Sequence, residues 1–188
     1  MLLSLDISTS CTGWAVFDNS KLVKAGAIET SSDDFDSFFS KMTHVIDSIK
    51  KICKDNNFDI KFIAVESALK KFTPGRSSSD VIAKLVGFNF CLTYHLTTHF
   101  GAKNLYFDVK SARAFCGIKV PKKKDAKIFV YNYVKARYPE LDWQFKKVTA
   151  KTNKDLAPVK SWCVDMSDAI VIGLAAIPKV AQNHSDVL

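Results

Sequence analysis

Four acidic residues interrupt apolar segments of this sequence, where a solvent-exposed charge is not expected. Asp6 lies inside the apolar run 2–7, and Glu66 ends a second apolar run. Asp165 and Asp168 precede a third apolar run near the C-terminus. Burial of an unpaired carboxylate costs a large desolvation free energy. Each of these four side chains therefore needs a cation or several hydrogen-bond donors beside it.

The types and spacing of these acids favour divalent metal ions. Asp165 and Asp168 are three residues apart, so a helix presents both on one face. Four carboxylates drawn to one point repel one another unless cations lie between them. Hard oxygen donors suit Mg²⁺ or Mn²⁺, which take further ligands from water and from substrate phosphate. Two such ions, about 4 Å apart, can activate water and stabilise the leaving 3′ oxygen of a phosphodiester.

Structural roles are the alternative for each acid taken singly. Asp165 can serve as the N-cap of the C-terminal helix, and Asp168 can be a favourable acidic charge in its first turn. Asp6 is harder to explain in this way, because it lies inside a predicted strand. No Ser-His-Asp or Cys-His arrangement is indicated, so water is the simplest nucleophile.

The order of predicted elements indicates one α/β domain over residues 1–188, with a five-stranded sheet of mixed direction flanked by helices. The turn Asp18–Ser20 joins the second and third strands as a hairpin. Residues 73–77 form a predicted loop, and residues 138–160 a loop or insertion. The expected strands are 2–8, 12–17, 21–28, 61–67 and 104–109, and the expected helices are 33–52, 79–98, 110–116, 124–137 and about 164–178.

The positive charge is concentrated in one stretch. Residues 101–160 contain 15 Lys or Arg and 5 Asp or Glu, whereas the rest of the chain is slightly acidic. A basic face of this size usually binds a polyanion, because each neutralised phosphate releases counterions. The alternative is a solvated lysine-rich surface that keeps the protein in solution.

Cysteine and histidine usage argues against disulfides and zinc. The five cysteines are odd in number and never form a CxxC pair, which favours reduced thiols in a cytosol-like compartment. His95 and His99 have helical i, i+4 spacing but lack a nearby third ligand. No basic leader precedes the first apolar run, and no window approaches about 18 uncharged apolar residues. We therefore expect neither secretion nor a membrane span.

Several motifs together resemble one nuclease family. The run LDISTSCTGWAV at 5–16 is similar to the first hairpin of RuvC-type Holliday junction resolvases. Val65-Glu66 resembles the strand-end glutamate of that family, and the run DMSDA at 165–169 resembles its Asp-x-x-Asp-Ala at the start of the last helix. Val109-Lys110, with Gly117-Ile118 and the lysines that follow, is similar to its basic segment. The resemblance covers the chain from residue 2 to about 177.

This resemblance implies a ribonuclease-H-like fold and a homodimeric, structure-selective endonuclease. Such an enzyme nicks symmetrically related strands at four-way DNA junctions, and a small stand-alone resolvase would suit the cytoplasm of a bacterium or of a virus-infected host. The resemblance implies that Asp6, Glu66, Asp165 and Asp168 are the catalytic residues and hold Mg²⁺, for which Mn²⁺ can substitute. One departure concerns the aromatic residue that the family often places three residues after its glutamate. Leu69 stands at that position here, and the nearest aromatic residue is Phe72.

Basic and aromatic residues supply candidate DNA contacts. Phe72 could stack on bases or wedge between them, although packing under its own loop is an equal alternative. Lysines in the dense basic run are expected to contact phosphates, and those flanking the loop after Glu66 could grip DNA beside the metals. The basic candidates are Lys70, Lys71, Arg76, Lys110, Lys119, Lys122, Lys123, Lys124 and Lys127.

A homodimer follows from the expected chemistry, since coordinated cuts on two strands need two active sites and one chain supplies residues for one. We expect the interface on the apolar helix 79–98. Four of its apolar residues exceed what one sheet face needs for cover, namely Phe88, Phe90, Leu92 and Leu96.

Three other functions compete with this hypothesis. An actin-like sugar kinase or ATPase also begins with an Asp-containing strand, but it needs phosphate-binding glycine turns in a duplicated domain, and this chain has only 7 glycines. A noncatalytic DNA-architecture protein gains nothing from clustered acids where DNA must lie. An RNA–DNA hybrid nuclease or a transposase-like strand-transfer domain shares the chemistry, and the sequence does not separate these from a junction resolvase.

Overall fold

A five-stranded mixed sheet forms the centre of the molecule in a computed structural model, which describes residues 1–31, 34–67, 79–122, 124–144 and 160–185. The order is β3-β2-β1-β4-β5, with β1 in the middle. β1 pairs antiparallel with β2 and parallel with β4, which confirms the predicted mixed sheet and hairpin. The strands are β1 Leu2–Ile7, β2 Cys11–Asp18, β3 Lys21–Glu29, β4 Phe62–Glu66 and β5 Lys103–Phe107.

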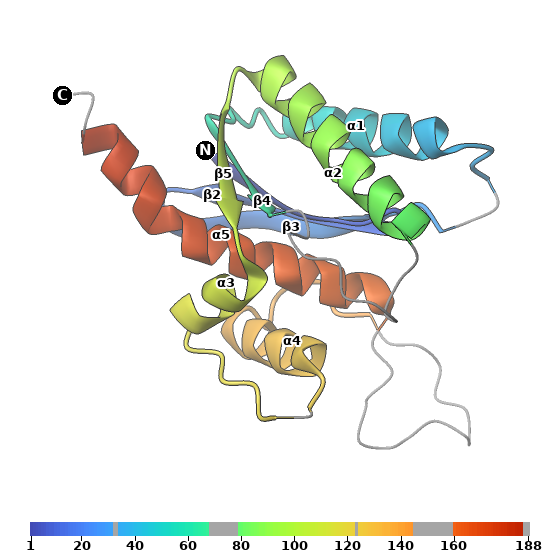
Figure 1. Cartoon of the computed structure of the whole chain (residues 1–188). Coiled ribbons are helices and arrows are strands. Elements are labelled where there is room, and N and C mark those ends of the chain that lie inside the picture. Colours follow the sequence, from blue (N-terminus) through green and yellow to red (C-terminus); the bar gives the residue numbers. More distant parts are fainter. Residues whose placement is uncertain (32–33, 68–78, 123, 145–159, 186–188) are drawn as a thin grey trace.

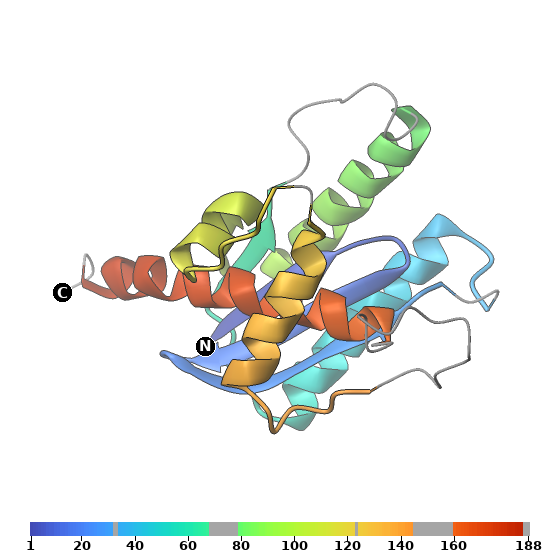
Figure 2. The same ribbon diagram turned by 90° about the horizontal axis from the view of Figure 1, so that it is seen from below.

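Helices cover both faces of this sheet (Figure 1). Two lie on one face, α1 Phe38–Asp55 and α2 Ser79–Phe100. Three lie on the other, α3 Val109–Phe115, α4 Ala126–Arg137 and α5 Ser161–Ser185. Figure 2 shows α5 running across the sheet, with α4 packed on its outer side. The element order β-β-β-α-β-α-β-α-α-α agrees with the order predicted from sequence.

The two layers have separate apolar cores because residues along each strand alternate between faces. On β1, Leu3, Leu5 and Ile7 pack under α1 and α2, whereas Leu2 packs under α5. Helix α5 is buried almost without interruption from Met166 to Ala176. This burial explains why its sequence is apolar all round rather than amphipathic.

Several predicted boundaries were wrong. α1 begins at Phe38 rather than near Asp33, because Ser37 and Ser40 form a capping box in which each hydroxyl accepts from the other's backbone N–H. The strand predicted to run to 109 ends at Phe107, since Asp108 caps α3. The last helix begins at Ser161, and Pro178 lies inside it instead of ending it.

The side of α2 that faces the sheet also differs from expectation. Phe88, Leu92 and Leu96 are fully buried in the core of the chain itself, so they are not available for a dimer interface. Phe90 is 68% exposed, because it lies on the opposite side of the helix from Phe88. The two helical histidines are exposed, and within the described residues no group of three His, Cys, Asp or Glu could bind a metal around them.

All five cysteines are free thiols, as the odd and scattered pattern predicts. Among the described helices, none combines the length and the apolar character needed to cross a bilayer.

Candidate active site

Asp6 and Glu66 lie at the carboxyl ends of two neighbouring parallel strands. β1 and β4 pair with Leu5 opposite Val65, so Asp6 and Glu66 follow at adjacent positions. The residues four positions before each of them pack in the core beneath α5. Because side chains alternate along a strand, Asp6 and Glu66 are directed to that same face.

Asp165 and Asp168 approach this place from α5. The helix begins at Ser161 and has no acidic residue in its first turn, so Asp165 is not an N-cap and Asp168 is not a first-turn charge. The capping role considered for Asp165 and the first-turn role considered for Asp168 are therefore wrong. Asp168 is only 5% exposed, which is unusual for a carboxylate unless it is paired.

A glycine lets α5 come close to the sheet at this point. Gly13 on β2 is the strand partner of Asp6. A Cβ atom built on Gly13 would overlap the backbone carbonyl of Asp165 and lie 2.8 Å from the nitrogen of Met166. The absence of a side chain at Gly13 thus allows the backbone of Asp165 to lie against β2, next to Asp6.

The four carboxylates share one electrostatic environment. Burial raises the pKa of Asp6 well above its ordinary value, and the charges of Asp168, Glu66 and Asp165 raise it further. Burial also raises the pKa of Glu66, with Asp168 as the next cause. Burial raises the pKa of Asp168 as well, against the opposing effect of Arg113. Such mutual perturbation in a recess marks a candidate functional site.

A cavity of about 460 Å³ opens onto these acids. It lies between the end of β1, the start of α5 and the cationic residues of α3 and α4. Its lining residues are Asp6, Ile7, Ser8, Ser10, Glu66, Leu85, Val109, Arg113, Lys127, Ser161, Val164, Asp165 and Asp168.

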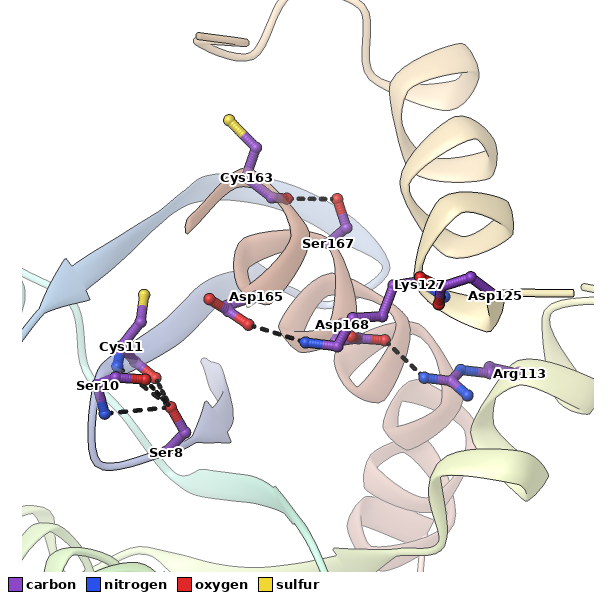
Figure 3. Close-up of polar contacts among 10 residues, drawn as sticks. All are labelled: Ser8, Ser10, Cys11, Arg113, Asp125, Lys127, Cys163, Asp165, Ser167 and Asp168. Carbon is purple, nitrogen blue, oxygen red and sulfur yellow. Dashed lines mark hydrogen bonds and ion pairs between the residues drawn. The ribbon is translucent and has the colours of Figure 1, made fainter. Parts of the chain in front are cut away.

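Two cations hold the aspartates of α5. Arg113 Nη2 donates to Asp168 Oδ1 at 3.2 Å, and Lys127 Nζ lies 3.6 Å from Asp165 Oδ1 (Figure 3). Partial burial alone would lower the pKa of Lys127, but the charges of Asp165, Asp168 and Asp6 raise it above its ordinary value. Lys127 is therefore charged at neutral pH, and together with the guanidinium of Arg113 it offsets part of the negative charge.

The donor set fits a hard divalent cation, although its side chains are not gathered around one point. All four acids supply carboxylate oxygens, the ligands that Mg²⁺ and Mn²⁺ prefer. Within the described residues, no three acidic, histidine or cysteine side chains form a ready metal site. The α5 aspartates each have one oxygen directed at a protein cation instead.

The turn after β1 is fixed by Ser8. Its hydroxyl donates to the carbonyl of Cys11 at 2.7 Å and accepts from the N–H of Cys11 at 3.1 Å. Thr30 Oγ1 donates to the carbonyl of Thr9, which ties the turn to the end of β3. This network holds the backbone directly after Asp6.

Cys11 lies beside the acids but is a poor nucleophile. Burial raises the pKa of its thiol far above the ordinary value, and neighbouring Asp165 raises it further. Only the thiolate form of cysteine is nucleophilic. This environment agrees with the absence of a Cys-His arrangement in the sequence.

The candidate DNA contacts have different outcomes. Lys127 lies in the cavity with the acids. The other described lysines of the set are exposed, around α3 and in the segment that leads to α4; they are Lys110, Lys119, Lys122 and Lys124. Lys70, Lys71, Phe72, Arg76 and Lys123 lie outside the described residues, as does Leu69.

Sequence reasoning missed Arg113, Gly13 and Ser8 as parts of this site. Arg113 is one basic residue among many in its stretch, and its partner Asp168 is 55 positions away in the chain. Gly13 and Ser8 stood inside the motif at 5–16, but only a three-dimensional arrangement assigns them a contact. The one signal in the sequence was that Ser8 and Gly13 lie close to Asp6 in the chain.

Comparison with solved structures finds proteins that share this fold, whereas comparison of sequences finds no match. No protein-family model and no curated protein sequence matches the chain. RuvC of T. thermophilus in complex with a Holliday junction substrate has a TM-score of 0.61 and 14% identity, covering 96% of this chain and 94% of that one. A second structure of Thermus thermophilus RuvC has a TM-score of 0.57, 12% identity and 96% coverage of both chains.

The yeast mitochondrial Holliday junction resolvase Ydc2 is similar to the same extent. Its TM-score is 0.57 at 14% identity, with 96% of this chain and 79% of that chain covered. At such low identities the likeness establishes a shared fold. The predicted ribonuclease-H-like fold of the RuvC type is therefore confirmed.

Proposed function

We propose that this protein is a structure-selective endonuclease that resolves four-way or other branched DNA by metal-dependent phosphodiester hydrolysis. The observation that carries the proposal is that Asp6, Glu66, Asp165 and Asp168 line one cavity, at the ends of β1 and β4 and near the start of α5. It is supported by the fold shared with RuvC of T. thermophilus, which was solved with a Holliday junction substrate.

In this proposal the four carboxylates hold Mg²⁺, with Mn²⁺ as a substitute. Bound divalent cations would supply an activated water and stabilise charge on the leaving 3′ oxygen. Lys127, which is half-exposed and lines the cavity, would attract a phosphate to the site. Ser8 would help to hold the backbone directly after Asp6 through its two hydrogen bonds to Cys11.

Metal-dependent cleavage of branched DNA is the direct test. We expect nicking of a synthetic four-way junction with Mg²⁺ or Mn²⁺ and none in excess EDTA, because the clustered carboxylates repel phosphate without cations. Linear duplex, a flap and an RNA–DNA hybrid serve as competing substrates. Undiminished cutting in EDTA would contradict the metal mechanism, and preference for the hybrid would assign the site to another ribonuclease-H-like nuclease.

The exposed lysines before α4 are proposed to bind the DNA backbone. We expect Lys122→Glu with Lys124→Glu to weaken junction binding and to lower its salt slope by about 0.9 for each lost phosphate contact. Binding measured at several salt concentrations gives the slope. Lys54→Glu is the control, because Lys54 is exposed on α1, on the opposite side of the sheet. An unchanged slope would assign Lys122 and Lys124 to solvent.

The proposed enzyme is a homodimer, because paired cuts need two active sites. The outer face of α2 is the candidate interface. Phe90 and Tyr94 are 68% and 61% exposed and lie one helical turn apart, opposite the buried face of α2. Exposed aromatic side chains of this kind are typical anchors of protein interfaces.

Sedimentation velocity tests the dimer. We expect the wild-type chain to sediment as a dimer and Phe90→Glu with Tyr94→Glu to sediment as a monomer, since charge cannot be buried unpaired at an interface. Phe39→Glu on α1 is a matched control, because Phe39 is also 68% exposed. A wild-type monomer, free and on a junction, would remove this proposal without affecting the metal site.

A further inference from the structure

Arg113 forms an ion pair with Asp168 that is more enclosed than the other charged pairs of the described residues. The exposed fractions of the two side chains are 17% and 6%, whereas Lys127 in the neighbouring pair is 57% exposed. A guanidinium stays protonated at any physiological pH. Arg113 is therefore a permanent positive charge among the residues that line the acidic cavity.

A short helix holds Arg113 in place. Asp108 caps α3 by accepting from the N–H of Ser111 at 3.0 Å, and Gly117 ends the turn with a φ of 70°. Ala112, directly before Arg113, is buried in the core beneath α5. The capped helix α3 and the packing of Ala112 thus determine where the guanidinium of Arg113 meets α5.

The hydrogen bonding of Arg113 is incomplete. Its Nε is buried and has no hydrogen-bond partner among the described residues. A buried donor without a partner costs free energy that a better arrangement would recover. Its bond to Asp168 uses Oδ1 of one of the four acids that the proposed function assigns to metal. The ion pair therefore occupies an oxygen of Asp168 that is a candidate metal ligand, and it leaves the Nε–H of Arg113 without an acceptor among the described residues.

We propose that Arg113 is a positioning residue that neutralises Asp168 in the metal-free protein and competes with the divalent cation for that carboxylate. This inference rests on the proposed function. Without Arg113, the buried charges of Asp168 and Glu66 lack their nearest permanent counter-charge. With a cation bound, the same guanidinium opposes it by like-charge repulsion. Arg113 thus stabilises the empty site and weakens metal binding.

Metal titration of Arg113→Gln distinguishes two roles of Arg113. It either competes with the cation for Asp168 or orients Asp168 for metal binding. We expect a lower melting temperature than wild type without metal and a dissociation constant for Mg²⁺ and Mn²⁺ tighter by roughly tenfold, from the loss of a nearby unit charge. Isothermal titration and melting curves at increasing metal concentration give both quantities. Arg113→Lys keeps the charge and should bind metal like the wild type. Arg137→Gln removes an exposed arginine of α4 that contacts Tyr133 and Tyr138, and should change neither quantity.

A second measurement uses the wild-type protein alone, in case Arg113→Gln does not fold without metal. The side-chain ¹⁵Nε resonance of Arg113, identified by its absence in Arg113→Lys, should shift on addition of Mg²⁺, while that of Arg137 should not. An unchanged Arg113 resonance at saturating Mg²⁺ would overturn the proposal.

The outcomes keep this inference apart from the proposed function. Metal binding by wild type with equal or weaker binding by Arg113→Gln would show that Arg113 orients Asp168, which overturns the competition and leaves the nuclease proposal intact. Absence of any metal response in wild type and Arg113→Gln, together with cleavage in EDTA, would overturn both.

Discussion

Asp6→Asn is expected to reduce junction nicking by orders of magnitude while leaving the metal-free protein at least as stable as the wild type. The substitution keeps the size of the side chain and removes one negative charge from the cluster. Burial and three neighbouring carboxylates raise the pKa of Asp6, so its ionised form opposes folding. Without this charge the metal-free protein loses an unfavourable contribution to its folding free energy. The proposed metal site loses one ligand, which lowers the nicking rate.

The same shift gives a pH dependence. Between the ordinary pKa of an aspartate and the raised pKa of Asp6, the folded protein keeps a proton that the unfolded chain has lost. The free energy of unfolding of the metal-free protein therefore falls as pH rises through this window. Glu66 and Asp168 act in the same direction, because their pKa values are also raised. In Asp6→Asn this part of the decrease should be smaller.

Melting curves with and without Mg²⁺, junction affinity and nicking rate on one preparation test this prediction. The wild type should gain stability from Mg²⁺ by linkage, and Asp6→Asn should gain much less. Junction binding should survive, since the exposed lysines are unchanged. If Asp6 belonged to a satisfied structural network, its replacement would cost about 1–3 kcal/mol. A variant that melts lower without metal and still cuts at the wild-type rate would contradict the catalytic assignment.

Much of this site was predictable because two simple periodicities position its acids. Alternation along β1 and β4 directs Asp6 and Glu66 to one face, and a spacing of three places Asp165 and Asp168 together on a helix. These relationships are local in the sequence. The helix boundary near Asp165 was wrong because Ser161 to Val164 add a turn that the apolar pattern did not require.

The cation partners of the acids could not be predicted, because they depend on packing between distant segments. Arg113 meets Asp168 only because α3 lies against α5. For the same reason, the sequence could not show which side of α2 is buried. Phe88 and Phe90 are equally apolar, and only the position of α2 on the sheet decides that one is buried and the other exposed.

Gly13→Ala should destabilise the protein and disturb the site, although it changes no acidic residue. The new Cβ would overlap the carbonyl of Asp165, which is backbone and cannot move by a change of rotamer. Overpacking of this kind costs about 1–3 kcal/mol. Either β2 or α5 must shift, and Gly13 is the strand partner of Asp6, so the distance between Asp6 and the α5 aspartates changes in both cases.

The expected result for Gly13→Ala is a lower melting temperature, a smaller Mg²⁺ increment and nicking reduced by roughly 100-fold, because misplacement by about 1 Å costs that much in catalysis. Gly87→Ala is the matched control. A Cβ at Gly87, inside α2, meets no atom within 4 Å. Alanine there should raise stability by about 0.5–1 kcal/mol through helix propensity. If Gly13→Ala melted like the wild type and kept its Mg²⁺ increment, the close approach of α5 to β2 would not be what sets the geometry of the four carboxylates.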